Sequence, residues 1–320
     1  MGQHQPPRYP SRPSRQCDNP RVDLASRLRA CERNWRLNAG GRLDGGFRSE
    51  VFGYTTADGE EVVIKLVATA EDTRAETAAL RAWSRTGAAV RLIDADFGHR
   101  ALLLERIRPA THLPAGDDPA VIEAAADVLG RLHRNAPETF RGPALEEIYV
   151  RMERRSRQDA AYEQGVRGEP ARGTAGLERL GLSRAAVTRL CATTEHAVLL
   201  HGDFLDKNLL WNGARYLAID PIPGVGDPCS DVGFFAAGHP PATTIRHRAD
   251  ALAGHLGLDR ERAQRWAAVW TVLQACQAWR QDQAELAACL SGREFEDLLR
   301  AKRVRPDPRA RRSRRNGARR

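Results

Sequence analysis

The sequence lacks long apolar segments. No stretch approaches the ~18 consecutive apolar residues that a membrane-spanning helix requires. The N-terminal segment MGQHQPPRYPSRPSRQ has no apolar core of the kind that marks a secretory signal. These absences disfavour a membrane protein and a secreted protein, and we expect a cytoplasmic protein without membrane contacts.

Cysteines at metal-binding spacing are also missing. The six cysteines include no Cys-x-x-Cys pair, and none has a histidine nearby at the spacing of a zinc site. A zinc centre and a disulfide framework are therefore both disfavoured. Thiols in a reducing compartment are the simpler interpretation.

Lysine is scarce in a chain that is rich in arginine. Lys65, Lys207 and Lys302 are the three lysines, against 47 arginines. Where a positive charge is all that is needed, this chain uses arginine. We therefore expect Lys65 to have a role that a compact ammonium fulfils better than a planar guanidinium. Lys207 is either a surface lysine or a charge near a transferred phosphate.

The positive charge is concentrated at the two ends of the chain. Residues 301–320 carry a net charge of +9 and residues 1–20 a net +2, which leaves −2 for residues 21–300. Both ends lack apolar periodicity and are expected to be disordered. The C-terminal tail, 302–320, could contact nucleic acid, but a solvated arginine-rich end explains it equally well.

The order of the expected elements predicts two lobes. The first lobe, 21–108, contains a glycine-rich loop, a hairpin around Ala57-Asp58-Gly59, a helix and two strands. The second lobe, 109–300, is mainly helical, with three short strands, and its residues 141–181 are left unassigned. Helices are expected, by apolar spacing, at 70–86, 119–135, 183–196, 243–257 and 259–280.

The segment HGDFLDKN, residues 201–208, places polar residues between two apolar runs. Asp203 and Asn208 lie five residues apart on the loop between two short strands. Asp220 follows at the end of a hairpin that turns at Asn212-Gly213, so it should return to the same edge. Two carboxylates and an amide oxygen suit Mg²⁺. This combination is typical of kinase-type phosphoryl transfer.

These motifs resemble the aminoglycoside phosphotransferases, in the branch of streptomycin 6-phosphotransferases and hydroxyurea resistance kinases. The resemblance covers roughly residues 25–290, and its most specific motifs are HGD at 201–203, LAIDP at 217–221 and GDPxxD at 226–231. It implies an α+β, protein-kinase-like two-lobed fold with a β-rich N-lobe and a mainly helical C-lobe. It also implies ATP and Mg²⁺ as cofactors and a small-molecule acceptor, an aminoglycoside such as streptomycin.

The same resemblance assigns roles to individual residues. The catalytic residues would be Asp203, Asn208 and Asp220, of which Asn208 and Asp220 would hold the metal and Asp203 would handle the acceptor hydroxyl. The nucleotide would be bound by Gly45, Gly46, Lys65, Glu76 and the backbone of Leu104 and Arg106. Glu71 and Asp72, on the same helix as Glu76, are alternatives to it. Asp231 would brace the catalytic loop.

Three positions depart from the pattern of the branch. Leu205 stands where the family has a histidine, and Lys207 where a glycine is common. Near the C-terminal helices an acid is replaced by Gln281, which leaves Asp282 as the acidic candidate for the substrate site. Fewer carboxylates are therefore available to bind a polycationic acceptor, and hydroxyurea or another small metabolite is an alternative.

The same residues admit other interpretations. His201 is expected to hold the loop through backbone hydrogen bonds, and Trp266, Trp270 and Trp279 are expected in the helical core rather than in a sugar-stacking site. A metal-dependent hydrolase would require more histidine ligands at short spacing. A non-catalytic ATP-binding protein with an RNA-binding tail would be expected to lack at least one of four residues: Lys65, Asp203, Asn208 and Asp220. All four are present, so we predict an active, monomeric enzyme.

Overall fold

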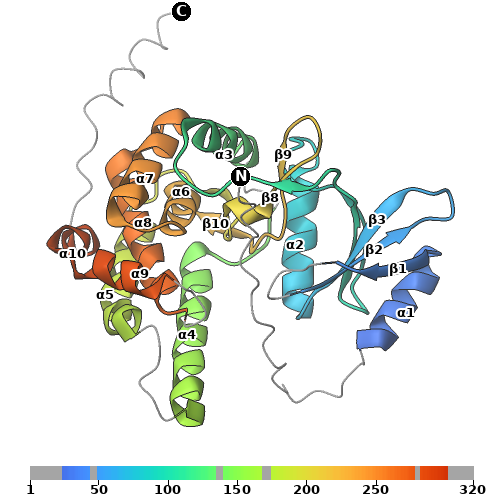
Figure 1. Cartoon of the computed structure of the whole chain (residues 1–320), viewed down its shortest axis with the longest axis horizontal. Coiled ribbons are helices and arrows are strands. Elements are labelled where there is room, and N and C mark those ends of the chain that lie inside the picture. Colours follow the sequence, from blue (N-terminus) through green and yellow to red (C-terminus); the bar gives the residue numbers. More distant parts are fainter. Residues whose placement is uncertain (1–23, 44–48, 135–139, 168–173, 278–281, 302–320) are drawn as a thin grey trace, which may run out of the picture.

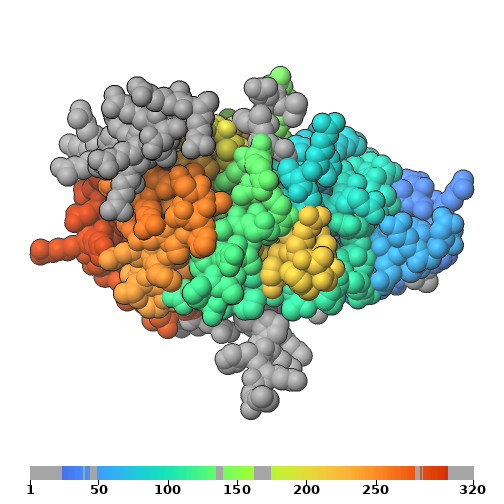
Figure 2. All heavy atoms as spheres, turned by 90° about the horizontal axis from the view of Figure 1, so that it is seen from above, coloured from blue at the N-terminus to red at the C-terminus, as the bar shows by residue number. Residues whose placement is uncertain are grey.

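The computed structural model describes residues 24–43, 49–134, 140–167, 174–277 and 282–301. A β-sheet region forms one end of the molecule and a helical region the other, as the ribbon and the space-filling view both show (Figures 1 and 2). The predicted α+β, two-lobed, protein-kinase-like fold is confirmed. No helix among these residues is long and apolar enough to cross a membrane.

The N-terminal region is built on a five-stranded antiparallel sheet of order β1-β2-β3-β5-β4. Its strands are β1 (Asn38–Arg42), β2 (Glu50–Thr55), β3 (Glu61–Leu66), β4 (Leu92–Asp96) and β5 (Ala101–Glu105). The predicted hairpin is formed by β2 and β3, and Gly59 in its turn adopts a positive φ of 83°. Glycine adopts this left-handed conformation without steric cost.

The alternation of side chains along β3 decides what each face of the sheet contacts. Val62, Ile64 and Leu66 point to the outer face, into a small core that includes residues of α1 (Leu24–Trp35). Lys65, one position out of phase, points to the opposite face, where α2 (Ala70–Trp83) lies. A shift of one residue in register would remove this lysine from the inner face.

Helix α2 begins where its sequence predicts. The Thr69 side chain accepts a hydrogen bond from the backbone N–H of Asp72 at 3.0 Å, which caps the helix. Glu71 and Asp72 lie in the first turn, where negative charge is favoured by the helix dipole. The cap fixes the start of the helix and thereby which of its acids faces the sheet.

The C-terminal region is mainly helical. Its helices are α3 (Pro119–Leu132), α4 (Leu145–Arg167), α5 (Thr174–Ala192), α6 (Cys229–Ala237), α7 (Ala242–Leu256), α8 (Arg260–Ala275), α9 (Gln283–Ser291) and α10 (Arg293–Arg300). Helix α4 lies in the segment that the sequence left unassigned. Trp266 and Trp270 are buried core residues, as expected, whereas Trp279 lies outside the described residues.

Two small sheets support the loops of the C-terminal region. Strands β6 (Thr111–His112), β8 (Leu209–Trp211) and β9 (Tyr216–Ala218) form one, and β7 (Val198–Leu200) pairs with β10 (Gly224–Gly226) in the other. The predicted hairpin turn at Asn212-Gly213 joins β8 to β9. The backbone of Ala218 also exchanges hydrogen bonds with Ala88 and Val90, which ties β9 to the N-terminal region.

Candidate active site

The loop after β7 is held in place by its own glycine and by a buried carboxylate. Gly202 has a φ of 74°, and a Cβ there would lie 2.0 Å from the Ile222 carbonyl oxygen, so only glycine fits. The Asp231 carboxylate accepts hydrogen bonds from the backbone N–H groups of His201 and Gly202, each at 2.9 Å, and from His133 Nε2 at 3.0 Å. Asp231 therefore braces the loop, as the resemblance implied.

His201 connects two backbone segments of the site through its ring nitrogens. Its Nε2 donates to the Ile219 carbonyl oxygen at 3.0 Å, and its Nδ1 accepts from the backbone N–H of Asp203 at 3.3 Å. Burial lowers the pKa of His201 to about 4, despite the nearby carboxylate of Asp231. The ring is therefore neutral at physiological pH. It links the loop of Asp203 to the segment that carries Asp220.

Asp203 and Asn208 contact each other across the loop. The side-chain amide of Asn208 donates to the Asp203 carbonyl oxygen at 2.8 Å and to its carboxylate Oδ2 at 3.0 Å. With Nδ2 engaged in this way, Oδ1 of Asn208 is the atom that a cation would contact. The predicted pair is thus formed, and its geometry depends on the path of the loop between the two residues.

Lys65 joins Glu76 to Asp220 at the inner face of the sheet. Its Nζ lies 2.5 Å from Glu76 Oε1 and 2.6 Å from Asp220 Oδ1. The side chains of Lys65 and Glu76 are almost fully buried, whereas 26% of the Asp220 side chain remains exposed. Asp220 has a left-handed backbone with a φ of 58°, an uncommon and costly conformation for a residue other than glycine.

One ammonium faces two carboxylates in this cluster, and their pKa values separate as a result. Burial disfavours the charge on Lys65, but Asp220 and Glu76 outweigh it and raise the pKa of the lysine. Burial tends to raise the pKa of Asp220 as well, but Lys65 lowers it overall. Burial, reinforced by Asp220, raises the pKa of Glu76 to about 7 even though Lys65 opposes the shift. Asp220 therefore stays ionised at neutral pH.

These residues line one cleft between the two regions of the molecule. Lys65, Glu76, Asp203 and Asp220 contribute to it together. At its edge, Arg151 Nη1 of α4 lies 2.9 Å from Glu71 Oε1 of α2, so an ion pair connects the two sides. Sequence reasoning did not find Arg151, because the polar segment around it gave no interpretable pattern.

The remaining predicted site residues have different locations. Gly45 and Gly46 lie outside the described residues. Leu104 is a residue of β5, and the backbone N–H of Arg106 donates to the Glu61 carbonyl oxygen at 3.3 Å, so a nucleotide contact through that N–H would have to share it. Asp282 precedes α9, is partly buried, and is not among the residues that line the cleft.

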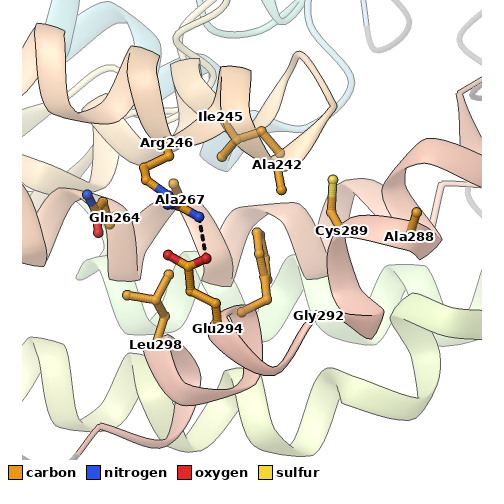
Figure 3. A pocket seen from close by; sticks show the side chains of 11 residues that line it. Ala242, Ile245, Arg246, Gln264, Ala267, Ala288, Cys289, Gly292, Glu294 and Leu298 are labelled. Carbon is orange, nitrogen blue, oxygen red and sulfur yellow. Dashed lines mark hydrogen bonds and ion pairs between the residues drawn. The ribbon is translucent and has the colours of Figure 1, made fainter.

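A second hollow lies in the helical region, between α7, α8, α9 and α10. Its lining is mainly apolar, with Ile245, Phe295 and Leu298 among its residues. Arg246 and Glu294 form an ion pair across it, as Figure 3 shows. The hollow contains none of the residues predicted to act in phosphoryl transfer and is separate from the cleft.

Asp220 in the cleft and Asn208 in the adjoining loop fit Mg²⁺ in the presence of a nucleotide. This ion is usually bound by one or two carboxylates together with phosphate oxygens and water, rather than by a cage of protein ligands. Asp220 and Asn208 offer one ionised carboxylate and one amide oxygen. Accordingly, no group of three or more acidic, histidine or cysteine side chains suited to a metal occurs among the described residues.

The strand order, the buried Lys65–Glu76 pair and the loop that carries Asp203 and Asn208 define a protein-kinase-like phosphotransferase. Residues 34–283 match the model of the aminoglycoside/hydroxyurea antibiotic resistance kinase family. The chain belongs to this family and is a small-molecule kinase.

Known proteins agree with this assignment. The chain is 34% identical to a hydroxyurea phosphotransferase of Kitasatospora aureofaciens, over 82% of this chain and 75% of that protein. It is 33% identical to a streptomycin 6-kinase of Streptomyces griseus, over 76% of this chain and 79% of that protein. A choline/ethanolamine kinase family protein from Mesorhizobium loti has a similar fold, with a TM-score of 0.57 at 17% identity, covering 86% of this chain and 97% of that structure.

Proposed function

We propose that the chain transfers the γ-phosphoryl group of ATP to a hydroxyl group of a streptomycin-like aminoglycoside, with Mg²⁺ as the metal. The observation that carries this proposal is the convergence of Asp203, Asp220 and the Lys65–Glu76 pair on one cleft, with Asn208 hydrogen-bonded to Asp203. Phosphoryl transfer depends mostly on positioning and charge neutralisation, and this set of residues provides both.

Each residue has a distinct proposed role. Asp203 orients the acceptor hydroxyl and accepts its proton, while Asn208 and Asp220 hold the metal. Mg²⁺, when bound, neutralises charge on the phosphates. Lys65 binds phosphate oxygens with the ammonium that here contacts Asp220, and Glu76 keeps it oriented. The Gly45-Gly46 loop and the backbone of Leu104 and Arg106 are proposed to contact the rest of the nucleotide.

The charges in the cleft favour a cationic acceptor. Five acidic side chains line it, against Lys65 and Arg151: Glu71, Asp72, Glu76, Asp203 and Asp220. Asp282 stays a proposed contact for a cationic group of the acceptor, as the family resemblance suggested. Hydroxyurea is the second candidate acceptor, because the relative with 34% identity is a hydroxyurea phosphotransferase.

The test is ADP release by the purified protein with ATP and Mg²⁺ across a panel of streptomycin, other aminoglycosides, hydroxyurea and choline. We expect turnover with streptomycin, and a phosphorylated product that mass spectrometry identifies. Turnover with hydroxyurea alone would replace the proposed acceptor and leave the kinase assignment intact.

Sedimentation of the same preparation tests the proposed monomer. Retention on RNA with and without residues 302–320 tests the tail.

A further inference from the structure

The catalytic loop contains a second acid, Asp206, to which the proposed reaction assigns no role. It begins the short helix η2 (Asp206–Asn208), three residues after Asp203 and two before Asn208. Its side chain is buried and does not line the cleft. Its Oδ2 lies 2.7 Å from Nε2 of His239, which directly follows the C-cap of α6. The two atoms form a close polar pair without the angles of a hydrogen bond.

A buried arginine lies close to the loop through two aromatic rings: it stacks on Phe235, whose ring centre is 5.6 Å from that of Phe204, between Asp203 and Asp206. Arg248 of α7 has no exposed surface, and its guanidinium carbon lies 3.9 Å from the ring centre of Phe235. Its Nη2 donates to the Phe235 carbonyl oxygen at 3.2 Å, but its Nε and Nη1 have no hydrogen-bond partner among the described residues. A buried charge with unpaired N–H groups is costly unless an opposite charge compensates it.

Asp206 is the main source of that compensation. Burial lowers the pKa of Arg248 to about 10, while the carboxylates of Asp206 and, more weakly, Asp117 oppose the shift. Asp206 therefore faces two groups of the helical region, His239 and Arg248.

The loop is thus anchored at two points. Asp231 holds its first residues through the backbone of His201 and Gly202. The second half has no comparable bond to Asp231. There, the backbone N–H of Asn208 donates to the Leu205 carbonyl oxygen at 2.9 Å, which closes a turn around Asp206. A displacement of Asp206 would therefore move Asn208 relative to its partner, Asp203.

We propose that Asp206, held by His239 and Arg248, is a positioning residue that fixes Asp203 and Asn208 in the geometry required for phosphoryl transfer. The inference rests on the proposed roles of those two residues. Misplacement of reacting groups by about 1 Å can reduce a rate on the order of 100-fold. His239 and Arg248 hold the segment from Asp206 to Asn208. A displacement of this segment would misplace Asn208 and so reduce the rate.

The test compares variants that keep the shape of these side chains and change their charge or bonding. In Asp206→Asn and in Arg248→Met we expect kcat to fall about 10-fold or more while KM for ATP changes little, because the loop and not the nucleotide contacts is disturbed. The double variant should lose no more than either single variant, because both act through one interaction. His239→Gln, which keeps a polar side chain beside Asp206, should retain more activity than His239→Leu.

Thermal unfolding of the same variants separates positioning from simple stability. Arg248→Met alone leaves the buried Asp206 without this opposite charge and should lower the melting temperature. The double variant removes both charges and should recover much of that stability, while its kcat stays low. Arg265→Met is the matched control, because Arg265 is a buried arginine that pairs with Glu261 within α8. Its kcat should stay at the wild-type value.

Two outcomes overturn the inference. Wild-type kcat in Asp206→Asn and Arg248→Met would show that the cluster does not position the loop. Losses that multiply in the double variant would show two independent effects. If a single variant does not fold, the double variant, which removes both charges, decides between these outcomes. An active Asp203→Asn enzyme would instead refute the proposed function, so the two failures are distinguishable.

Discussion

Replacement of Asp231 by asparagine should loosen the catalytic loop and destabilise the whole molecule. The Asp231 carboxylate is 1% exposed and accepts three hydrogen bonds, two of them from backbone N–H groups that are buried with it. Hydrogen bonds to a charged group contribute roughly 1.5–3 kcal/mol each. Asparagine retains one oxygen, so we expect one or two of these bonds to be lost, at a cost of about 1.5–6 kcal/mol.

This loss is measurable by urea unfolding at pH 7. The midpoint should fall, and the kcat of the folded enzyme should fall with it, because Gly202 and His201 lose their anchor. Glu60→Gln is the control: Glu60 pairs with Arg91, and more than half of each side chain is exposed. Exposed ion pairs contribute only about 0–1 kcal/mol. An unchanged midpoint and kcat in Asp231→Asn would refute the reasoning.

The contribution of Asp231 should also depend on pH. Burial tends to raise its pKa, but the hydrogen bonds from His133 and Gly202 outweigh burial and lower it below the ordinary value. A carboxyl group with a lowered pKa in the folded state stabilises the fold above its ordinary pKa of about 4. This stability is lost as the pH falls through the folded value. The difference between wild type and Asp231→Asn should therefore shrink in acid.

Further predictions concern the phosphate-binding lysine, the loop glycine, the acceptor contact and the C-terminal tail. Lys65→Arg should reduce kcat about 100-fold or more in a coupled assay, because a planar guanidinium does not fit between two carboxylates that an ammonium contacts together; wild-type kinetics would remove our explanation for this lysine. Gly202→Ala should yield a poorly folded protein by circular dichroism, because its Cβ would collide with the Ile222 carbonyl oxygen; normal stability would contradict this geometry. Asp282→Asn should raise KM for streptomycin and leave hydroxyurea kinetics unchanged; equal values for streptomycin in both proteins would exclude Asp282 from the site. Deletion of 302–320 should leave the melting temperature and kcat unchanged; a large drop would show that the tail packs on the body.

The sequence predicted those parts of the fold that local patterns determine. The hairpin at Ala57-Asp58-Gly59 and the apolar spacing of α3 and α8 were sufficient to place these elements. Helix α4 was missed because it is polar along much of its length and presents no continuous apolar face to recognise. The start of α5 was placed too late, at 183 rather than Thr174, since its first two turns are only partly buried.

The candidate site was predictable where its residues are close in sequence, and less so where they meet only after folding. Asp203, Asn208 and Asp220 lie within one short segment, and the scarcity of lysine singled out Lys65. The choice of Glu76 over Glu71 and Asp72 depends on the phase of α2 relative to β3, which spacing alone does not determine. His239 and Arg248 reach the loop from distant segments, and no sequence motif connects them to Asp206.

The most direct test of the central claim compares nucleotide binding with phosphoryl transfer in Asp203→Asn. If Asp203 acts on the acceptor hydroxyl, the variant should bind ATP with wild-type affinity in titration calorimetry. It should transfer phosphate to the acceptor identified for the wild type at least ~100-fold more slowly. Unchanged transfer by Asp203→Asn would contradict the assignment of this cleft as the catalytic site.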